Sequence, residues 1–391
     1  MWKQIKSKKS RYREKKVNSH INTSGRDMQL DHLFVQDYRN ILQTDLDFSP
    51  KLNCFVGKNG MGKTNLLDAI YCLSFCRSSF SQTEQLTVRH GAECYQLQGS
   101  YLLPAGDRTV IGCVSRIKGA KQFKRDGKEY QRFSDHIGYI PLVMVSPQDT
   151  ELITGGSDER RRFMDIIISQ YDSEYLKLLI AYNKATQQRN ALLKMEIEPD
   201  REMFLMWEQI MAETGQKIFE KRRALTDRLV PYFQEMYSLI GDASEQVTLL
   251  YTSHAQRGDL LKQFEDGRGL DRSAGYSLHG IHKDELEMNL DGYPIRREGS
   301  QGQNKSYLVA LKLAQYRLLK ESCGKRPLLL LDDIFDRLDS ARVGRIISLV
   351  SDNDKFGQVF ITDVDRNHID GIMENAGCDY KVFTVQDGQV I

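Results

Sequence analysis

The chain has 391 residues, 40% of them hydrophobic and 28% charged, and its formal net charge is +2. This composition is ordinary for a folded protein of one to three domains and excludes an intrinsically disordered chain. Seven cysteines without C-x-x-C pairs indicate a reducing, cytoplasmic environment rather than a disulfide framework or a zinc site. No apolar run approaches the roughly 18 residues of a membrane span, so we expect no membrane partner.

Residues 1–27 form a basic leader. It carries nine Lys or Arg against Glu14 and Asp27, a net charge of +7, which leaves −5 for residues 28–391. The leader has no apolar centre and is therefore not read as a signal peptide. It is either a disordered arm that binds nucleic acid or an extension upstream of the regular pattern that begins at Met28, and we favour the extension.

The first part of the regular pattern predicts strands around one glycine-rich loop. Alternating or apolar runs predict strands at residues 30–38, 42–46, 52–56, 95–103, 109–117, 122–130 and 140–145. Residues 93–145 are expected to form an antiparallel meander, with a hairpin turn at Asp126-Gly127. A helix is expected from the glycine-rich loop to about Cys76.

The loop at residues 57–64 reads Gly-Lys-Asn-Gly-Met-Gly-Lys-Thr, a complete G-x-x-x-x-G-K-[ST] motif between a strand and a helix. Its glycines let backbone N–H groups point at phosphate oxygens, and the helix N-terminus adds partial positive charge. Lys63 is expected to reach the β- and γ-phosphates, and the Thr64 hydroxyl to bind Mg²⁺. The predicted nucleotide-binding residues are Gly57, Lys58, Asn59, Gly60, Met61, Gly62, Lys63 and Thr64.

From residue 157 to about 240 the pattern is helical, and Pro199 and Pro231 are expected to interrupt it. Beyond it we expect strands at 246–251, 285–289, 328–331 and 358–362, helices at 303–321 and 341–350, a hairpin turn at Asp291-Gly292 and a strand pair after 377. The predicted fold is α/β, a mixed sheet with helices on its faces and an antiparallel meander. The predicted body comprises residues 28–150 and 246–391, and residues 151–245 form an inserted helical arm lobe.

Two carboxylates follow the apolar strand at residues 328–331. The carboxyl end of a parallel strand is where α/β sheets place ligands. Asp332 is expected to hold Mg²⁺ beside Thr64, and Asp333 to orient or deprotonate the attacking water. Together with Lys63, these two acids are the predicted catalytic residues.

A second anion site is predicted at residues 300–303, Ser-Gln-Gly-Gln, where a helix begins. Gln303 precedes Asp332 by 29 residues, and this arrangement resembles the signature motif of ABC-type ATPases. In that superfamily the signature of one subunit contacts the γ-phosphate bound by the other. The resemblance makes Ser300, Gly302 and Gln303 nucleotide contacts, puts residues 336–339 at the D-loop and puts Thr362 at the switch position.

The order of several sequence blocks is similar to the RecF family, bacterial recombination and replication-repair proteins related to SMC ATPase heads. These blocks are residues 35–40, 57–65, 137–149, 160–165, 188–193, 280–285 and 299–303. Ile281, Lys283 and Glu285 stand where the family has Pro, Arg and Asp. Residues 336–337, Asp-Arg, replace the usual Ser-Glu, which leaves the D-loop contact open.

The resemblance implies an ATP-dependent DNA clamp with ATP and Mg²⁺ as cofactors. ATP would close a homodimer on double-stranded DNA or a single-strand/duplex junction, and slow hydrolysis would release it, which would help to load recombinase at gaps. RecR, with RecO, would be the protein partners. Because the chain beyond the leader is acidic overall, DNA would need a local basic patch. Its candidates are Lys118, Lys121, Lys124, Arg125, Lys128, Arg132, Arg160, Arg161 and Arg162.

Three alternatives are open from the sequence. A transporter's nucleotide-binding subunit is opposed by Thr362 in place of the switch histidine and by the 268 residues between Thr64 and Asp332. Another SMC-like repair or defence ATPase would have long heptad arms, whereas residues 157–245 suffice for a short lobe. A DNA-binding scaffold that does not hydrolyse ATP is opposed by the intact Lys63, Asp332 and Asp333.

Overall fold

The structure, a computed structural model, describes residues 27–81, 83–197, 199–242, 244–335, 339–364 and 379–391. Residues 1–26 of the predicted basic leader and residues 336–338 of the predicted D-loop lie outside this set. Within the described residues, no helix is both long and apolar enough to cross a membrane.

Strands β4 to β7 of the predicted meander join β1 and β2 in a six-stranded antiparallel sheet of order β2-β1-β4-β5-β6-β7. Its strands are β1 (Gln29–Tyr38), β2 (Ile41–Asp47), β4 (Cys94–Leu102), β5 (Arg108–Arg116), β6 (Gln122–Arg125) and β7 (Lys128–Glu129). The turn between β6 and β7 lies at Asp126 and Gly127, both with positive φ, as the sequence predicted. The end of the predicted meander is wrong, because residues 142–145 pair in parallel with residues 328–331 in the other sheet.

A second six-stranded sheet has the order β15-β14-β3-β13-β12-β8. Its strands are β3 (Leu52–Val56), β8 (Leu142–Val145), β12 (Leu328–Leu331), β13 (Val359–Asp363), β14 (Tyr380–Gln386) and β15 (Gln389–Val390). All neighbours are parallel except β14 and β15. The carboxyl ends of β3, β12 and β13 therefore meet at one edge of the sheet.

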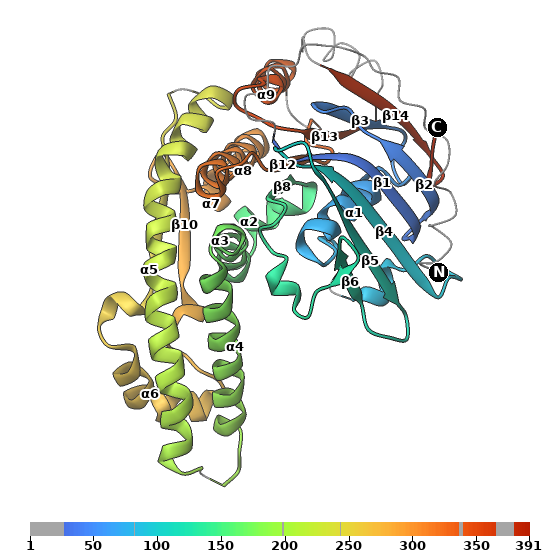
Figure 1. The fold of residues 1–391 in the computed structure, drawn as a ribbon. Helices are drawn as coiled ribbons and strands as arrows, with labels where there is room; N and C mark the ends of the chain where they lie inside the picture. The colour runs from blue at the N-terminus through green and yellow to red at the C-terminus, as the bar shows by residue number, and fades with distance from the viewer. Residues whose placement is uncertain (1–26, 82, 198, 243, 336–338, 365–378) are drawn as a thin grey trace.

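The parallel strands are buried on both faces, because helices cover both sides of the sheet. On one face Leu329 and Leu331 join a core with α8 (Gln301–Cys323) and α9 (Ser340–Ser351). On the other face Leu328 and Leu330 join a core with α1 (Lys63–Phe75) and side chains of the meander. Helix α1 thus lies between the two six-stranded sheets (Figure 1).

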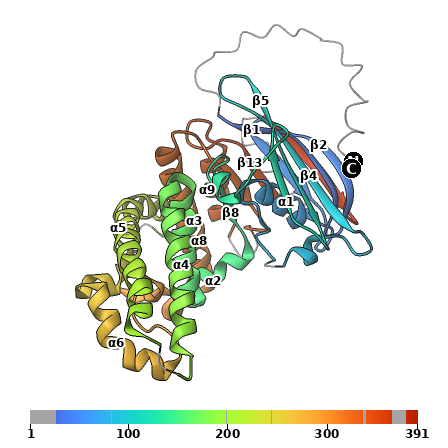
Figure 2. The ribbon, with the colours of Figure 1, turned by 60° about the horizontal axis from the view of Figure 1, so that its bottom comes forward.

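A helical arm extends from this body (Figures 1 and 2). Its long helices are α3 (Ser157–Tyr171), α4 (Ser173–Leu193), α5 (Arg201–Ile240) and α6 (Leu260–Ala274). A three-stranded sheet of β9 (Val247–Thr252), β10 (Glu285–Leu290) and β11 (Tyr293–Pro294) runs beside α5. The short helices are α2 (Glu151–Thr154), α7 (Ile295–Glu298), η2 (Glu84–Thr87), η3 (Phe133–Asp135), η4 (Pro147–Thr150), η5 (His254–Arg257) and η6 (Ile281–Lys283).

Two features of the arm differ from the sequence prediction. Pro231 does not interrupt a helix. It lies inside α5, which has 40 residues and continues to Ile240, and the nearby Phe233 packs against Tyr307 of α8. Helix α6 was not predicted at all. It begins at an Asp259 cap and ends at Gly275, with φ 75°, and it buries Leu260 and Phe264 in the core.

Helix α6 is held to the arm by buried ion pairs. The Arg189 guanidinium of α4 is fully buried and pairs with Asp271 of α6 at 2.6 Å and with Glu208 of α5 at 3.0 Å. Arg268 of α6 adds a 2.5 Å contact to the same Glu208 carboxylate. Buried charges need such complete pairing. We infer a division into body and arm close to the predicted one, with α6 added to the arm.

Candidate nucleotide site

The glycine-rich loop joins the end of β3 to the start of α1. Gly60 and Gly62 have φ of 82° and 111°, values that favour glycine. A Cβ atom on Gly57 would lie 2.2 Å from the Val385 carbonyl oxygen, so β14 leaves no room for a side chain there. Gly62 caps α1 without a side chain, which leaves the first backbone N–H groups of the helix facing the loop.

Lys63 is buried, and its ammonium lies against the loop. Its Nζ atom donates to the carbonyl oxygens of Gly57, at 2.7 Å, and Lys58, at 3.1 Å. Asn40, which precedes β2, supports the other side of the loop. Its side chain accepts a 2.7 Å hydrogen bond from Asn65 and donates one of 3.4 Å to the Gly60 carbonyl. Asn40 belongs to residues 35–40, one of the sequence blocks that resemble the RecF family, but the sequence predicted no role for it.

The structure brings Thr64 and Asp332 together, as predicted. Thr64 Oγ1 donates to Asp332 Oδ1 and Oδ2 at 2.9 and 3.0 Å. Thr362, at the end of β13, donates to Asp332 Oδ1 at 2.8 Å and accepts from the Asp333 backbone N–H at 2.9 Å. Burial raises the pKa of Asp332 from its ordinary value to about 6. Thr362 therefore connects both acids of the pair.

Asp333 has a left-handed backbone, with φ 45°. Aspartate and asparagine tolerate this conformation better than other residues with side chains. The turn directs the chain away from β12 immediately after Asp332, and Asp333 borders a cleft of about 700 Å³ together with Asn59, Asp332 and Thr362. A carboxylate at this position can contact a water molecule beside the phosphate loop.

The residues present fit Mg²⁺. The Thr64 hydroxyl and the Asp332 carboxylate are adjacent hard oxygen donors, and the carboxylate is otherwise bonded to hydroxyl groups. Among the described residues, no group of three or more His, Cys, Asp or Glu side chains could hold a metal ion by itself. This suits an ion whose remaining ligands come from phosphate oxygens and water.

The predicted signature turn begins α8. Ser300 Oγ accepts from the Gln303 backbone N–H at 3.2 Å, and Gln303 Oε1 accepts from the Ser300 N–H at 2.8 Å, so the two residues form a reciprocal cap. Ser300 is exposed. In the part of the chain that the structure describes, no hydrogen bond joins this turn to residues 57–64. Gln301 of the turn and the following residues Asn304 and Lys305 border the 700 Å³ cleft.

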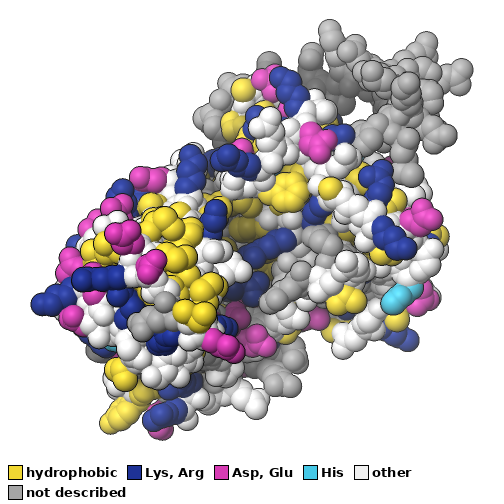
Figure 3. Space-filling view, turned by 90° about the horizontal axis from the view of Figure 1, so that it is seen from below, with side chains coloured by type: hydrophobic (Ala, Val, Ile, Leu, Met, Phe, Trp, Pro, Cys, Tyr) yellow, Lys and Arg dark blue, Asp and Glu magenta, His cyan; other side chains and the backbone are white. Residues whose placement is uncertain are grey.

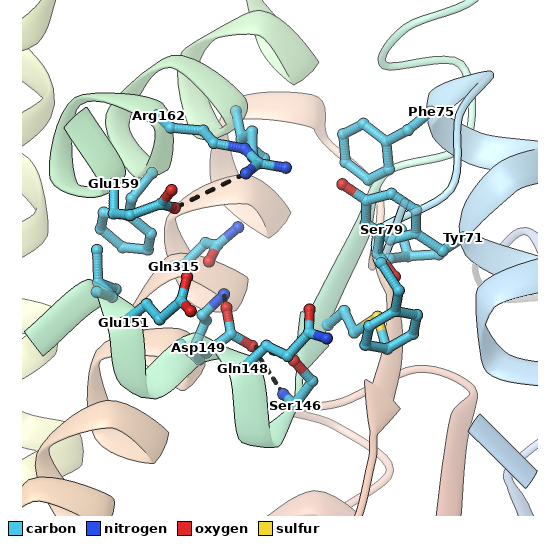
Figure 4. Close-up of a pocket in the computed structure, with 17 residues that line it drawn as sticks. Tyr71, Phe75, Ser79, Ser146, Gln148, Asp149, Glu151, Glu159, Arg162 and Gln315 are labelled. Carbon is cyan, nitrogen blue, oxygen red and sulfur yellow. Dashed lines mark hydrogen bonds and ion pairs between the residues drawn. The ribbon is translucent and has the colours of Figure 1, made fainter. Parts of the chain in front are cut away.

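A smaller pocket of about 130 Å³ lies where the body meets the arm, between α1 and α3 (Figure 4). Its floor is the loop after β8, in which Asp149 accepts from the Ser146 N–H at 2.7 Å and pairs with Lys312 of α8 at 2.5 Å. Strand β8 also accepts from the Asp332 N–H through Val145, at 2.8 Å. One continuous segment thus connects the acid pair to the arm.

The family model described as RecF/RecN/SMC N terminal domain matches residues 29–390. The DNA replication and repair protein RecF of Bacteroides thetaiotaomicron is 54% identical over 363 residues, which cover 93% of this chain and 98% of that protein. The chain belongs to the RecF family. The RecF of Porphyromonas gingivalis is 47% identical over 364 residues, 93% of this chain and 100% of that protein.

Solved structures agree with this membership. The recombination mediator protein RecF-ATP in the RecFOR pathway aligns with a TM-score of 0.84 and 27% identity, over 95% of this chain and 99% of that one. The Smc head domain of Pyrococcus furiosus, bound to the C-terminal domain of ScpA, aligns with a TM-score of 0.57 at 17% identity, over 93% of this chain and 96% of that one. The Smc likeness supports the fold alone. The predicted ABC-type ATPase fold and the RecF resemblance are confirmed. Membership of the RecF family argues against the alternative of a transporter's nucleotide-binding subunit.

One predicted DNA contact is wrong. Arg160 is only 5% exposed, because its guanidinium is paired with Glu285 at 2.5 Å and with the Gly155 carbonyl at 2.9 Å. It holds α3 to β10. Lys121, Lys124, Arg161 and Arg162 are half-buried, and Lys124 lies 3.7 Å from Glu129. The exposed cations among the candidates are Lys118, Arg125, Lys128 and Arg132.

Proposed function

We propose that this RecF-family chain is an ATP-dependent DNA-binding switch of recombinational repair and replication restart. ATP closes two copies, the closed pair holds duplex DNA or a single-strand/duplex junction, and slow hydrolysis releases it, which helps to load recombinase at gaps. One observation carries the proposal above others. Each chain has a phosphate loop with its acid pair, and also a signature turn with an exposed Ser300 that, among the described residues, makes no hydrogen bond to that loop.

The ATP step uses groups that are already side by side. Bound ATP and Mg²⁺ supply the phosphoryl group and the charge that polarises it. Lys63 and the loop N–H groups would hold the phosphates, Thr64 and Asp332 would hold the metal ion, and Asp333 would orient the attacking water and accept its proton. Asp333 reaches less far than the glutamate of most transporters, which supports slow turnover.

Pairing of two copies follows from the exposed turn. Ser300 and the N-terminus of α8 offer N–H groups and a hydroxyl to an anion. Gly302 has no side chain to cover the turn, and a Cβ atom there would lie only 2.9 Å from Arg342 Nη1. The signature turn of one copy would bind the γ-phosphate of the ATP held at residues 57–64 of the other copy. ADP lacks that phosphate and should not close the pair.

The best-supported candidate for the DNA-binding surface is the concave surface between body and arm. A cleft of about 480 Å³ there is bordered by Arg77, Arg161 and Arg162, and by Phe133 of the loop that follows β7. Figure 3 shows dark blue Lys and Arg side chains along the hollow between the two lobes. The exposed cations of the meander, Arg125, Lys128 and Arg132, belong to the segment that leads into this loop. Phosphate contacts of this kind give salt-dependent binding without sequence preference.

Protein partners are proposed from the relatives alone. The solved relatives are described as recombination mediators in the RecFOR pathway. We propose RecR, with RecO, as the partners of this chain.

The deciding experiment is light scattering of the purified chain with ATP, ADP or no nucleotide, each with and without a 30-base-pair duplex. We expect a dimer with ATP only, and tighter DNA binding in the same condition. A monomer at saturating ATP, with and without DNA, would overturn the switch.

A further inference from the structure

The Glu245 carboxylate connects the signature turn to the arm. Its Oε1 atom accepts a 2.6 Å hydrogen bond from the side-chain amide of Gln303, and its Oε2 atom accepts one of 2.5 Å from the Tyr237 hydroxyl. Tyr237 lies in the last turn of α5, and Glu245 lies in the loop between α5 and β9. No sequence pattern had singled out either residue.

Glu245 determines which way the Gln303 amide points. A carboxylate only accepts hydrogen bonds, so it binds the NH₂ end of the amide and leaves the oxygen end for the Ser300 N–H, 2.8 Å away. Hydrogen bonds to a charged acceptor are also stronger than neutral ones. The orientation of both residues in the signature turn therefore depends on this one carboxylate.

Tyr237 makes the contact part of a packed unit. Its side chain is 1% exposed, and burial, with the Glu245 hydrogen bond, raises the pKa of its hydroxyl, which stays a donor. Its ring packs edge-on against Tyr307, one turn along α8 from Gln303, with ring centres 6.1 Å apart. The end of α5 and the start of α8 are thus joined both by polar groups and by aromatic packing.

We propose that Glu245 is a positioning residue for the contact between two copies. It holds Ser300 and Gln303 in the geometry that meets the partner's γ-phosphate, and through Tyr237 it makes that geometry depend on the position of the arm. A shift of α5 relative to α8 breaks one of its two hydrogen bonds and frees the Gln303 amide to turn. The inference rests on the proposed ATP-dependent pairing.

The test compares Glu245→Ala with wild type by light scattering over a range of protein concentrations at saturating ATP. We expect pairing to weaken about tenfold, which corresponds to about 1.4 kcal/mol. Binding of a fluorescent ATP analogue to the monomer and the melting temperature should not change. Glu245→Gln keeps an acceptor for Gln303 and should restore most of the pairing, while Tyr237→Phe should show a partial loss.

Glu235→Ala is the matched control. Glu235 also joins α5 to α8, through Arg317, but at a more exposed position away from the turn, so its loss should leave pairing unchanged. Equal pairing of Glu245→Ala and wild type would overturn the inference and leave the proposed function standing. A parallel loss of pairing, nucleotide binding and melting temperature in Glu245→Ala would also overturn it, because the role would then be structural. If wild type itself does not pair, both proposals fail together.

Discussion

The Thr64 hydroxyl lies 2.9 Å from a carboxylate oxygen of Asp332, although 268 residues separate them in the chain. Only β13 lies between β3 and β12 in the parallel sheet, so the segments after these strands meet at the same edge. Thr362, at the end of β13, completes the group by bonding to Asp332 and to the Asp333 N–H. This arrangement gives specific expectations for single substitutions.

Lys63→Met should abolish ATP binding and ATP-dependent pairing while the chain remains folded. The Lys63 ammonium donates to the loop carbonyls of Gly57 and Lys58, at 2.7 and 3.1 Å. Methionine keeps the length of the side chain and removes the charge that offsets the phosphates. Equilibrium binding of a fluorescent ATP analogue measures the effect. Lys355→Met, at an exposed position of similar chemistry, is the control and should bind like wild type.

Asp333→Asn should bind ATP normally, slow hydrolysis about 100-fold or more and accumulate the paired form. Asparagine tolerates the left-handed backbone at this position, φ 45°, so the fold should not be disturbed. Phosphate release and light scattering on the same sample separate chemistry from pairing. Wild-type turnover in this variant would remove Asp333 from the mechanism.

Asp332 should make both stability and metal binding depend on pH near 6. Its folded pKa is raised to about 6 by burial, above its unfolded value. The folded chain therefore keeps a proton that the unfolded chain has lost, and the free energy of unfolding of the nucleotide-free protein falls as pH rises from about 4 to about 6. Mg²⁺ competes with that proton, so ATPase activity should fall as pH drops below 6.

Asp332→Asn separates the two effects. Without nucleotide it should raise the free energy of unfolding by roughly 1–3 kcal/mol at pH 8 and by about half as much at pH 5, because the unfolded carboxyl, with its ordinary pKa of 3.8, is already ionised at pH 5. Hydrolysis should be lost at both pH values. Equal changes in melting temperature at pH 5 and pH 8 would contradict the raised pKa.

Arg77→Glu should weaken duplex DNA binding by the ATP-bound form several-fold. The slope of log affinity against log salt concentration should become shallower by about one, the loss of one phosphate contact. Arg77 is exposed at the 480 Å³ cleft between body and arm, and no ion pair to it occurs among the described residues. Fluorescence anisotropy between 50 and 200 mM salt provides the measurement. Arg201→Glu, near the tip of the arm with a 75% exposed side chain, is the control that should bind DNA like wild type.

The local parts of the nucleotide site could be predicted from sequence. The loop at residues 57–64 depends on glycines and on a lysine and threonine at fixed spacing, and these are visible in eight consecutive letters. The acid pair follows four leucines whose apolar run marks a buried strand, and its position after that strand already indicates a ligand edge. Most strand and helix bounds agree with the predictions to within a few residues.

Features that depend on distant contacts could not be predicted in this way. A proline normally ends a helix, but packing against α8 keeps α5 continuous through Pro231. The buried face of helix α6 includes Asp271 beside Leu260 and Phe264, and only Arg189 of another helix, which pairs with Asp271, shows why a carboxylate lies on that face. Arg160 looks like a surface charge in its arginine run, and only Glu285, from a strand 125 residues away, shows that it is buried.

The sequence by itself determined the phosphate loop, the acid pair and the family, because these depend on residue types at short, fixed spacing. The tertiary structure alone decided which hydroxyls meet Asp332, which arginines remain at the surface, and that Glu245 holds Gln303. Such contacts join side chains from separate elements. Their distances are fixed by the order of strands in the sheet and by the packing of the arm, neither of which is written in any local pattern.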